Sequence, residues 1–374
     1  MPISEKSFRI GCGRYLQGEN IILSQAGKEV ARLGKYPVIV GDDTAMSVAG
    51  DALVQSISQT CECYETVIHN GTCCEERARE IALMKEEKGC DVIVGVGGGV
   101  IMDFAKLCGY FAHCPVINIP TSSATCAAYT ALSVRYTPEG RTVGSLHYDH
   151  EVDAVLADTA VIAKQPVRLL LAGVFDAMAK FVEIKQRFRM EDSLADAALP
   201  DEEKCPLGLA EAYVLSSYTY ELLNHTVAEC LKDMEEGILT HRLDNIIFAS
   251  IATTGVISGI ARGSNQCALA HKFYEITRVL FHEAAKTYLH GEIVGIGLLL
   301  QNFFNGEAEN NEELLKLMKQ YHMPYRITDV GITATEEVLE EYYNHLCASS
   351  SVDEKNEEAC ERLRQGLHYL WGIC

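Results

Sequence analysis

The stretch DVIVGVGGGVIMDFAK, residues Asp91 to Lys106, decides the fold. A Val-rich apolar run, typical of a buried strand, ends in Gly97, Gly98 and Gly99, and a helical pattern follows directly. In a doubly wound sheet, such a turn lies at the carboxyl edge of the strands, where ligands bind. The amides at the start of the following helix favour a diphosphate there. A tight turn without any ligand remains the alternative interpretation.

The spacing of these glycines does not match the common nucleotide fingerprints. G-x-G-x-x-G would require a glycine at position 100, which is Val100, and no G-K-[ST] of a P-loop follows. The turn therefore predicts a phosphate without identifying the molecule that carries it.

Short Val- and Ile-rich runs recur on both sides of this stretch. They predict strands at residues 37–43, 64–69, 91–96, 115–120 and 154–158, with amphipathic helices at 44–57 and 74–88. Strands that alternate with helices imply a parallel sheet with crossover helices. Residues 132–148 differ, because two alternating runs flank a turn at 137–140 and predict a hairpin.

After Pro166 the pattern becomes helical. Long helical stretches are expected at residues 207–236, 242–260 and 266–286, and capping boxes at Thr333–Glu336 and Ser351–Glu354 predict two further helix starts. We therefore predict an α/β domain with a parallel sheet over residues 1–165 and an all-α domain over residues 166–374.

Bulk properties exclude several classes of partner and compartment. A net charge of −20 argues against nucleic acids and anionic membranes, and the longest apolar runs, 92–102 and 293–300, are too short to span a bilayer. The 15 cysteines never show C-x-x-C spacing, and no signal-peptide-like segment begins the chain. We expect reduced thiols in a cytoplasmic protein.

Two further features support a nucleotide. Asp42 and Asp43 end the predicted strand at 37–43, where a carboxylate can accept hydrogen bonds from ribose hydroxyls and repel a 2′-phosphate, which favours NAD over NADP. A helix N-cap is an equally good explanation for this pair. The segment 118–134 is dense in small hydroxylated residues, which suits a loop around phosphates.

One carboxylate and two imidazoles, far apart in the sequence, form a candidate metal site. Asp176 begins a helical stretch, and His271 and His290 lie 19 residues apart, too far for one helix face. Such a ligand set suits zinc or iron with an open coordination position. His282 competes with His290, because a continuous helix would place it on the same face as His271, and spacing alone does not choose between them.

Several motifs together resemble the glycerol dehydrogenase branch of the iron-containing alcohol dehydrogenase and dehydroquinate synthase-like superfamily. These are RYLQGEN near the start, GVGGG with Asp103 four residues on, TALSVRYTPEG, LAGVFDAMAKFVE, AHKFYE and HGEIVGIG. The resemblance covers nearly the whole chain. It implies the dehydroquinate synthase-like fold, an NAD-binding α/β domain, a helical metal-binding domain and assembly into a homo-oligomer.

The resemblance also assigns residues. It implies the metal ligands Asp176, His271 and His290, so that His282 takes no part, and it implies contacts to NAD from Asp42, Gly97, Gly98, Gly99, Asp103, Thr121, Thr130, Leu132 and Tyr136. Iron-type members carry a further ligand histidine four residues after the aspartate, where this chain has Lys180. That difference favours the three-ligand branch, which uses zinc.

Three positions depart from the family pattern. Val100 stands where a lysine usually follows the glycines, Ala124 replaces a serine of the phosphate loop, and Cys126 replaces the aspartate expected to contact a polyol at the catalytic site. The first two changes remove a charge and a hydroxyl near the nucleotide, which lowers the expected affinity for NAD. Because a thiol accepts hydrogen bonds poorly, Cys126 makes glycerol itself an unexpected substrate.

We therefore expect an NAD-dependent, metal-dependent dehydrogenase of a small alcohol or polyol. The first alternative is a sugar-phosphate cyclase of the dehydroquinate synthase type, which requires cations for a substrate phosphate; Lys180, Lys272, Arg262 and Lys286 are candidates. A glycerol-1-phosphate-type dehydrogenase is a variant of the main prediction. A nucleotide-binding protein without efficient catalysis is the last alternative, suggested by the three departures.

Overall fold

The computed structural model describes residues 8–190, 207–262, 267–349 and 351–372. The chain packs into two compact units, which are described separately below. The first unit comprises Met1–Pro166 and Glu229–Arg262, and the second comprises Val167–Ala228 and Gly263–Cys374. The chain first passes from one unit to the other after Pro166, next to the predicted domain boundary between residues 165 and 166. The sequence did not indicate that residues 229–262 pack with the first unit. The functional assignment of the two domains stays a prediction.

A six-stranded parallel sheet forms the centre of the first unit. Its order is β1-β8-β5-β4-β2-β3, and every neighbouring pair of strands is parallel. The strands are β1 (Tyr15–Gly18), β2 (Pro37–Gly41), β3 (Glu65–Ile68), β4 (Val92–Gly97), β5 (Val116–Pro120) and β8 (Ala154–Asp158). The five strands predicted from apolar runs are confirmed, and the short β1 is additional.

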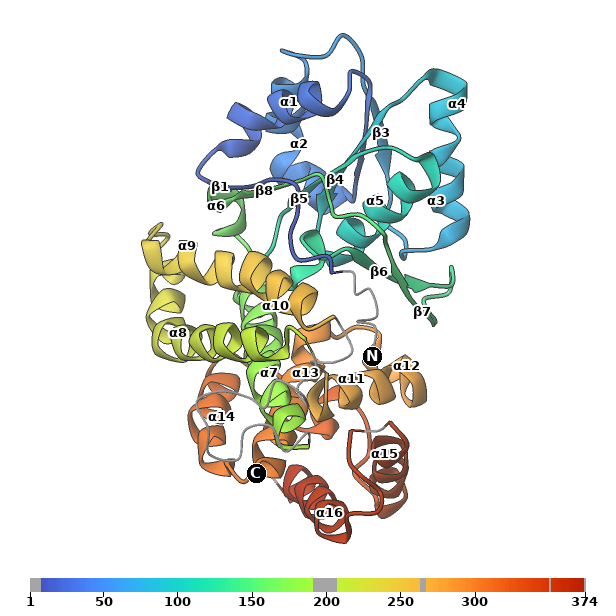
Figure 1. Ribbon diagram of the computed structural model, residues 1–374. Coiled ribbons are helices and arrows are strands. Elements are labelled where there is room, and N and C mark those ends of the chain that lie inside the picture. Colours follow the sequence, from blue (N-terminus) through green and yellow to red (C-terminus); the bar gives the residue numbers. More distant parts are fainter. Residues whose placement is uncertain (1–7, 191–206, 263–266, 350, 373–374) are drawn as a thin grey trace. The chain divides into compact units, whose positions relative to one another are not determined.

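Helices cover both faces of this sheet, which explains why its central strands are buried along their whole length. They are α1 (Ile21–Leu33), α2 (Asp43–Ile57), α3 (Glu75–Ala82), α4 (Met84–Lys88), α5 (Gly99–Ala112) and α6 (Thr159–Ile162). Figure 1 shows α1 and α2 on one face and α3 to α5 on the other. Val92, Val94 and Val96 join the core beneath α1 and α2, whereas Gly95 faces the opposite way, toward Ala105 of α5.

The strand order places the glycine turn at a switch point of the sheet. After β2 the chain adds β3 on one side, and β4 then returns to the other side of β2. Ligands of doubly wound folds bind at such a point, outside the carboxyl ends of the strands. Asp42 directly follows β2, and Gly98 and Gly99 directly follow β4, so both predicted nucleotide features lie at this point.

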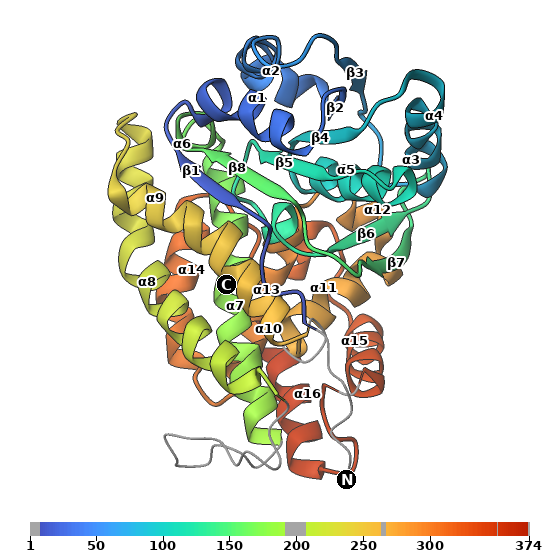
Figure 2. The same cartoon turned by 45° about the horizontal axis from the view of Figure 1, so that its top comes forward.

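The segment 229–262 adds helices to the first unit. It contains the end of α8 (Leu209–Glu235), then α9 (His241–Phe248), the π-helical turn η2 (Ala249–Thr253) and α10 (Thr254–Ile260). Figure 2 shows α9 and α10 alongside β1, where the side chain of Gln17 donates a hydrogen bond to the carbonyl of Asp244. In the part of the chain that the structure describes, His241–Ile260 is long and apolar enough to cross a membrane, but 61% of its most apolar part is buried, as in a core helix.

A small hairpin completes the first unit and confirms the prediction for residues 132–148. Strands β6 (Leu132–Tyr136) and β7 (Thr142–His147) pair antiparallel. The turn between them is closed by a hydrogen bond from the amide of Gly140 to the carbonyl of Thr137, and Gly140 adopts a φ of 85°.

The second unit is helical, as predicted. Besides the first part of α8, it contains α7 (Val167–Met190), α11 (Leu269–Leu280), α12 (His282–Ala285), α13 (His290–Phe304), α14 (Asn311–Gln320), α15 (Glu336–Ala348) and α16 (Glu357–Gly372). Helix α13 is its central element, because nearly all of its residues are buried and it packs against α7, α11 and α16.

Two glycines of α13 let the neighbouring backbones approach closely. A Cβ on Gly291 would lie 1.9 Å from the carbonyl oxygen of Ala172 in α7, and one on Gly297 would lie 2.5 Å from that of Ala270 in α11. Real Cβ atoms do not tolerate such distances, so the sequence HGEIVGIG is a packing motif as well as a source of one histidine.

Four details of the helical prediction are wrong. Asp176 lies in the middle of α7 rather than at its start, and the helix expected over 266–286 is interrupted at Phe281, which leaves helical geometry and stacks on Tyr342. The caps of α15 and α16 are Thr335 and Asn356, not Thr333 and Ser351. More than one residue able to cap a helix precedes each of these two helices. The residue that becomes the cap depends on where the helix has to begin for its apolar side to be buried. Residue 266 itself lies outside the described residues.

Candidate active site

The three glycines of the turn in the first unit have different surroundings: two are closely packed, and one faces open space. A Cβ on Gly97 would meet Ile101 at 2.7 Å, and one on Gly99 would meet Thr125 at 2.6 Å, so packing within the chain excludes both. At Gly98, the N-cap of α5, an added Cβ would have only the hydroxyl of Ser122 nearby, at 3.9 Å. The protein itself leaves the space beside Gly98 open, which fits the close approach of a phosphate to the first amides of α5.

Asp42 takes the structural role that the sequence left open. One of its carboxylate oxygens accepts a hydrogen bond from the amide of Ala45 at 2.7 Å, so that Asp42 is the N-cap of α2. The other oxygen faces the turn, 3.2 Å from the position a Cβ of Gly97 would occupy. A single carboxylate can therefore cap the helix and still accept a ribose hydroxyl, and the second role stays a prediction. Asp43 is exposed and pairs with Asn70.

A buried lysine holds the loop that follows β5. Lys106, only 3% exposed, donates hydrogen bonds to the carbonyl oxygens of Ala127 at 2.7 Å and Thr130 at 3.0 Å, and also to that of Leu132. Its charge pairs with Asp103 at 2.9 Å. Three carbonyls gathered on one ammonium define the path of the chain through the predicted contacts Thr130 and Leu132. The sequence motif did not reveal this role of Lys106.

Asp103 contributes to the same arrangement. Its carboxylate accepts a hydrogen bond from the amide of Val134 at 3.0 Å, and its carbonyl accepts one from the hydroxyl of Ser133 at 2.7 Å. Asp103 thus ties the start of β6 to α5. Backbone hydrogen bonds also hold Thr121 and Tyr136, the predicted NAD contacts at the two ends of the loop. The amide of Thr121 donates to the carbonyl of Gly97, and the amide of Tyr136 donates to the carbonyl of Cys73.

The three departures from the family pattern lie in distinct surroundings. Val100 occupies the first turn of α5 and is 47% exposed, which is unusual for an apolar residue beside a ligand turn. Ala124 is 9% exposed. Cys126 is 8% exposed and begins a short 3₁₀ helix, η1 (Cys126–Ala128), whose N-cap is Thr125.

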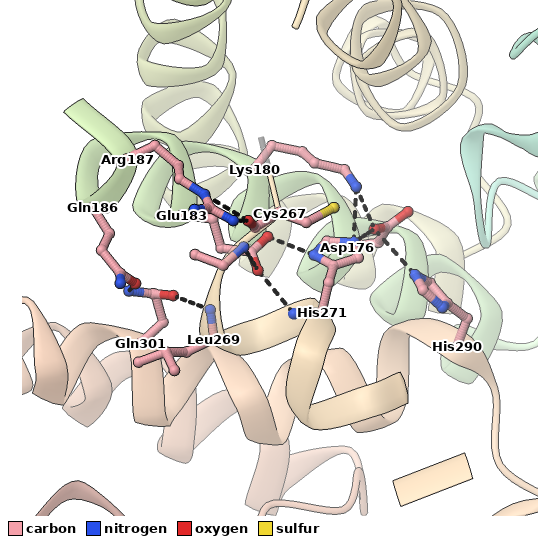
Figure 3. Close-up of polar contacts among 11 residues, drawn as sticks. Asp176, Lys180, Glu183, Gln186, Arg187, Cys267, Leu269, His271, His290 and Gln301 are labelled. Atoms are coloured by element: carbon pink, nitrogen blue, oxygen red, sulfur yellow. Dashed lines mark hydrogen bonds and ion pairs between the residues drawn. The ribbon is translucent and has the colours of Figure 1, made fainter. Parts of the chain in front are cut away.

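In the second unit, three helices bring the predicted metal ligands together. Asp176 comes from α7, His271 from α11 and His290 from the first position of α13. One possible ligand atom of each lies within 4.8 Å of the others, and no other such group of His, Cys, Asp and Glu occurs among the described residues. Figure 3 shows the three side chains pointing toward one another. His282 belongs to the separate helix α12 and is not part of this group.

The distances are those of a compact ligand set. Nε2 of His271 lies 3.1 Å from Oδ1 of Asp176, and Nε2 of His290 lies 3.5 Å from the same oxygen. Asp176 and His271 are almost fully buried, whereas His290 keeps 33% of its side chain exposed. One carboxylate oxygen and two imidazole nitrogens that share a small buried space fit a zinc or iron ion.

Glu183 orients the first histidine. It lies seven residues after Asp176 on α7, is fully buried, and receives the Nδ1–H of His271 at 2.5 Å. Its second oxygen accepts the amides of Ala268 and His271, each at 2.8 Å. This bond directs Nε2 of His271 toward Asp176, as the carboxylate partner of a metal-binding histidine does. The motif contained Glu183, but its role was not recognised.

The surroundings act differently on the three members of the triad. Burial would raise the pKa of Asp176, but the charge of Lys180 and the contacts with both histidines hold that pKa well below its ordinary value. Desolvation would lower the pKa of His271, yet the charge of Glu183 raises it, so a metal bound to Nε2 has to displace a proton. Desolvation lowers the pKa of His290, so its ring is neutral at neutral pH.

The start of α13 is built to place His290. The carboxylate of Glu292 accepts a hydrogen bond from the amide of Leu289 at 2.8 Å. It also accepts two hydrogen bonds of 2.6 Å from the guanidinium of Arg168 in α7. Gly291 lets the backbone of α7 approach at the same point. The three residues of the HGE motif thus supply a predicted metal ligand, His290, a close backbone approach at Gly291 and a helix cap, Glu292.

Comparison with known proteins identifies the family. A model of the family described as "Iron-containing alcohol dehydrogenase" matches residues 12–159. The glycerol dehydrogenase of Thermotoga maritima is 32% identical over 322 residues, which cover 86% of this chain and 84% of that protein. The glycolaldehyde reductase of Halobacterium salinarum is 27% identical over 327 residues, covering 87% and 85%.

A solved structure agrees with the fold. That of glycerol dehydrogenase from Schizosaccharomyces pombe matches with a TM-score of 0.81 at 22% identity, over 98% of this chain and 92% of that chain. The identity and coverage shared with the Thermotoga enzyme exceed what an unrelated protein would show. The chain belongs to the iron-containing alcohol dehydrogenase family, within its glycerol dehydrogenase-like branch.

Proposed function

We propose that this protein is an NAD-dependent, metal-dependent dehydrogenase of a small alcohol or polyol. Membership of the family makes the chain an oxidoreductase that acts on alcohols or polyols. The observation that carries the proposal is the convergence of Asp176, His271 and His290, with Glu183 behind His271. A divalent cation bound there would act as a Lewis acid that lowers the pKa of a substrate hydroxyl.

We propose zinc as the cation rather than iron. Three protein ligands with an open position are typical of catalytic zinc sites. The position four residues after Asp176, from which a further ligand would come, is occupied by Lys180, whose ammonium has no lone pair to offer.

The proposed nucleotide is NAD, at the turn formed by Gly97, Gly98 and Gly99. The open space beside Gly98 supports the placement of the diphosphate, and the half-buried carboxylate of Asp42 supports a ribose without a 2′-phosphate. Lys106 and Asp103 hold the loop that carries Thr130 and Leu132, so this loop is ordered before the cofactor arrives. An ordered loop reduces the entropy that binding has to overcome.

The substrate is a small alcohol or the corresponding carbonyl compound. Related chains are named glycerol dehydrogenase and glycolaldehyde reductase, which indicates small, polar two- or three-carbon compounds. Cys126 replaces a carboxylate that would accept two hydroxyls, so we propose a substrate with fewer free hydroxyls than glycerol.

The residues around the proposed metal site have two roles: some bind the cation, and others position the ligand residues. Asp176, His271 and His290 hold the cation, and Glu183 keeps the ring of His271 in the required orientation and tautomer. Arg168 and Glu292 hold the start of α13 and therefore the position of His290.

A sugar-phosphate cyclase is the less supported alternative. Such a site needs free cations for a substrate phosphate, but Lys272 and Lys286 each pair with a glutamate three residues along the chain, at 2.6 Å. Net NADH formation separates the two reactions, because a dehydrogenase accumulates NADH and a cyclase regenerates NAD in each turnover.

The experiment compares two histidines. Purified wild-type protein, His271→Ala and His282→Ala are analysed for bound metal and screened for NADH formation with small diols, polyols and hydroxyketones. We expect His271→Ala to lose metal and turnover together and His282→Ala to keep both. Turnover by metal-free His271→Ala would overturn the mechanism, and NAD binding measured by calorimetry without turnover on any compound would favour a non-catalytic nucleotide-binding protein.

We also propose a cytoplasmic location. None of the thirteen described cysteines forms a disulfide, as is usual in a reducing compartment. Assembly into a homo-oligomer, and the absence of nucleic-acid and membrane partners, stay predictions from the sequence.

A further inference from the structure

A lysine side chain reaches into the proposed metal pocket. Lys180 lies one helical turn after Asp176 on α7, and only 6% of its side chain is exposed. Its Nζ lies 2.8 Å from Nε2 of His271 and 3.4 Å from Oδ1 of Asp176. Figure 3 shows Lys180 directed at the two ligand residues from the same helix as Asp176.

The contact with His271 uses the nitrogen that a metal would need. Nδ1 of His271 faces Glu183 at 2.5 Å, so Nε2 is the ring nitrogen left to bind a metal. Nζ of Lys180 lies 2.8 Å from this nitrogen and so occupies space that a metal bound there would need. An imidazole nitrogen has one lone pair, and a zinc ion would occupy it at about 2.0 Å. Lys180 and a cation therefore compete for one atom of His271.

The same ammonium lies beside two of the predicted ligand atoms. Nε2 of His271 and Oδ1 of Asp176 are 3.1 Å apart, and both face Nζ of Lys180. A buried positive charge at this point stabilises the ionised carboxylate of Asp176. In this arrangement Lys180 performs the electrostatic role of a cation in the pocket.

We propose that Lys180 is an internal occupant of the metal pocket that sets its affinity for a divalent cation. In the metal-free protein the ammonium holds Asp176 and His271 in their ligand positions. For a cation to bind, Lys180 withdraws from Nε2 of His271, and its positive charge then remains close to the bound ion. The inference rests on the proposed function, because it assumes that Asp176, His271 and His290 bind the metal.

The proposal predicts that removal of the lysine strengthens metal binding. Lys180→Leu offers no donor, no charge and no alternative metal ligand, so no charged group remains beside Nε2 of His271. We expect the dissociation constant for Zn²⁺ to fall by about tenfold or more, because like charges repel strongly in a buried pocket. Lys180→Gln removes the charge with a polar side chain and serves as a second variant if the leucine variant does not fold.

Metal affinity is measured directly, without turnover. Metal-free wild type, Lys180→Leu, Lys180→Gln and the control Lys272→Leu are titrated with Zn²⁺ in competition with a chromophoric chelator. Lys272 also carries a charge next to His271 in the chain, but it pairs with Glu275 outside the triad. Its substitution should leave the affinity unchanged.

The outcomes separate the two proposals. Tighter binding by the Lys180 variants alone, lost again when His271→Ala is added, supports the inference. Unchanged or weaker binding by a folded Lys180 variant, with a wild type that binds through His271, overturns the inference and leaves the metal site standing. Binding by the Lys180 variants but not by wild type supports the inference and contradicts metal dependence of the natural protein. Binding by neither overturns both.

Discussion

At the scale of the residue, the two ring nitrogens of His271 contact different groups. Glu183 takes the Nδ1–H, and Nε2 faces Asp176 and Lys180. The carboxylate behind the ring selects the tautomer and raises the pKa of the imidazole, which strengthens Nε2 as a ligand. The quality of the site thus depends on a residue that would not touch the metal.

Glu183→Gln tests this dependence. The amide nitrogen of glutamine would face Nδ1 of His271 as a donor, so the ring would move its hydrogen to Nε2 and lose the ligand lone pair. We expect metal affinity to fall by about 10- to 100-fold, measured by chelator competition. Glu275→Gln, an exposed change on the same helix as His271, should have no effect. Wild-type affinity in folded Glu183→Gln would contradict the assigned role.

Gly98 offers a second test at this scale. Because an added Cβ would approach only Ser122, at 3.9 Å, Gly98→Ala should cost less than about 1 kcal/mol of unfolding free energy. The same methyl group would occupy the space proposed for the diphosphate, so the dissociation constant for NAD should rise about tenfold or more. Calorimetric titration and thermal unfolding measure the two effects. Gly99→Ala is the counterpart that disturbs the fold, since its Cβ would collide with Thr125. Unchanged NAD binding by Gly98→Ala would remove the cofactor from this turn.

At the scale of the element, the metal site depends on how closely three helices pack. Gly291 and Gly297 bring the backbone of α13 against α7 and α11, and each of these three helices contributes one ligand. The Arg168–Glu292 pair fixes the start of α13 against α7. A small displacement of one helix would therefore separate the ligand atoms by a distance comparable to a metal–ligand bond.

Gly291→Ala should displace α13 from α7. The new Cβ would lie 1.9 Å from the carbonyl oxygen of Ala172, so the helices have to separate, at a cost of about 3 kcal/mol of unfolding free energy. Metal affinity should fall as well, because His290 moves with the helix. Denaturant unfolding and chelator competition provide the measurements. Gly372→Ala, where an added Cβ meets nothing within 4 Å, is the matched control. A variant as stable as wild type would show that the close approach is not required.

The scale of the element also shows where prediction failed. Short Val- and Ile-rich runs correctly predicted five strands, and four of these strands, β2, β4, β5 and β8, are buried along their whole length in the parallel sheet. The break at Phe281 was not predictable from neighbouring residues, since no glycine or proline marks it and the cause is packing against Tyr342. The same break decides between His282 and His290, which spacing alone could not do.

At the scale of the whole molecule, metal binding links elements that are distant in the sequence. Asp176 and His290 lie 114 positions apart in the chain, yet both would bind the same ion. An ion that binds only the folded arrangement stabilises the protein by mass action. The stability of the second unit should therefore depend on the concentration of free metal.

Removal of metal should lower the melting temperature. With Zn²⁺ at 100 times its dissociation constant, binding adds about 2.7 kcal/mol to the unfolding free energy, and dialysis against a chelator should remove this increment. Differential scanning calorimetry measures the shift. His271→Ala should melt at the same temperature with and without Zn²⁺. A wild-type protein whose melting temperature does not respond to Zn²⁺ would contradict a structural contribution of the site.

The candidate site was only partly predictable. The resemblance in sequence assigned the three metal ligands and the glycine turn, and the structure brings those three ligands together. The roles of Glu183, Lys180 and Lys106 were not assigned, although each lies in a quoted motif. Each of these roles depends on a partner at least twenty residues away in the chain, and the sequence does not state which distant atoms meet.

The amino-acid sequence by itself determined the alternation of strands and helices and the glycine turn. These follow from local rules, namely side-chain periodicity and backbone freedom at glycine, whereas the ligand set came from the family resemblance. Only the tertiary structure decided that Glu183 contacts His271 and that Lys180 lies against the other ring nitrogen, and it brings His290 rather than His282 to Asp176, which spacing had left open. Those outcomes depend on the packing of α7, α11 and α13, which is a property of three helices together and of none alone.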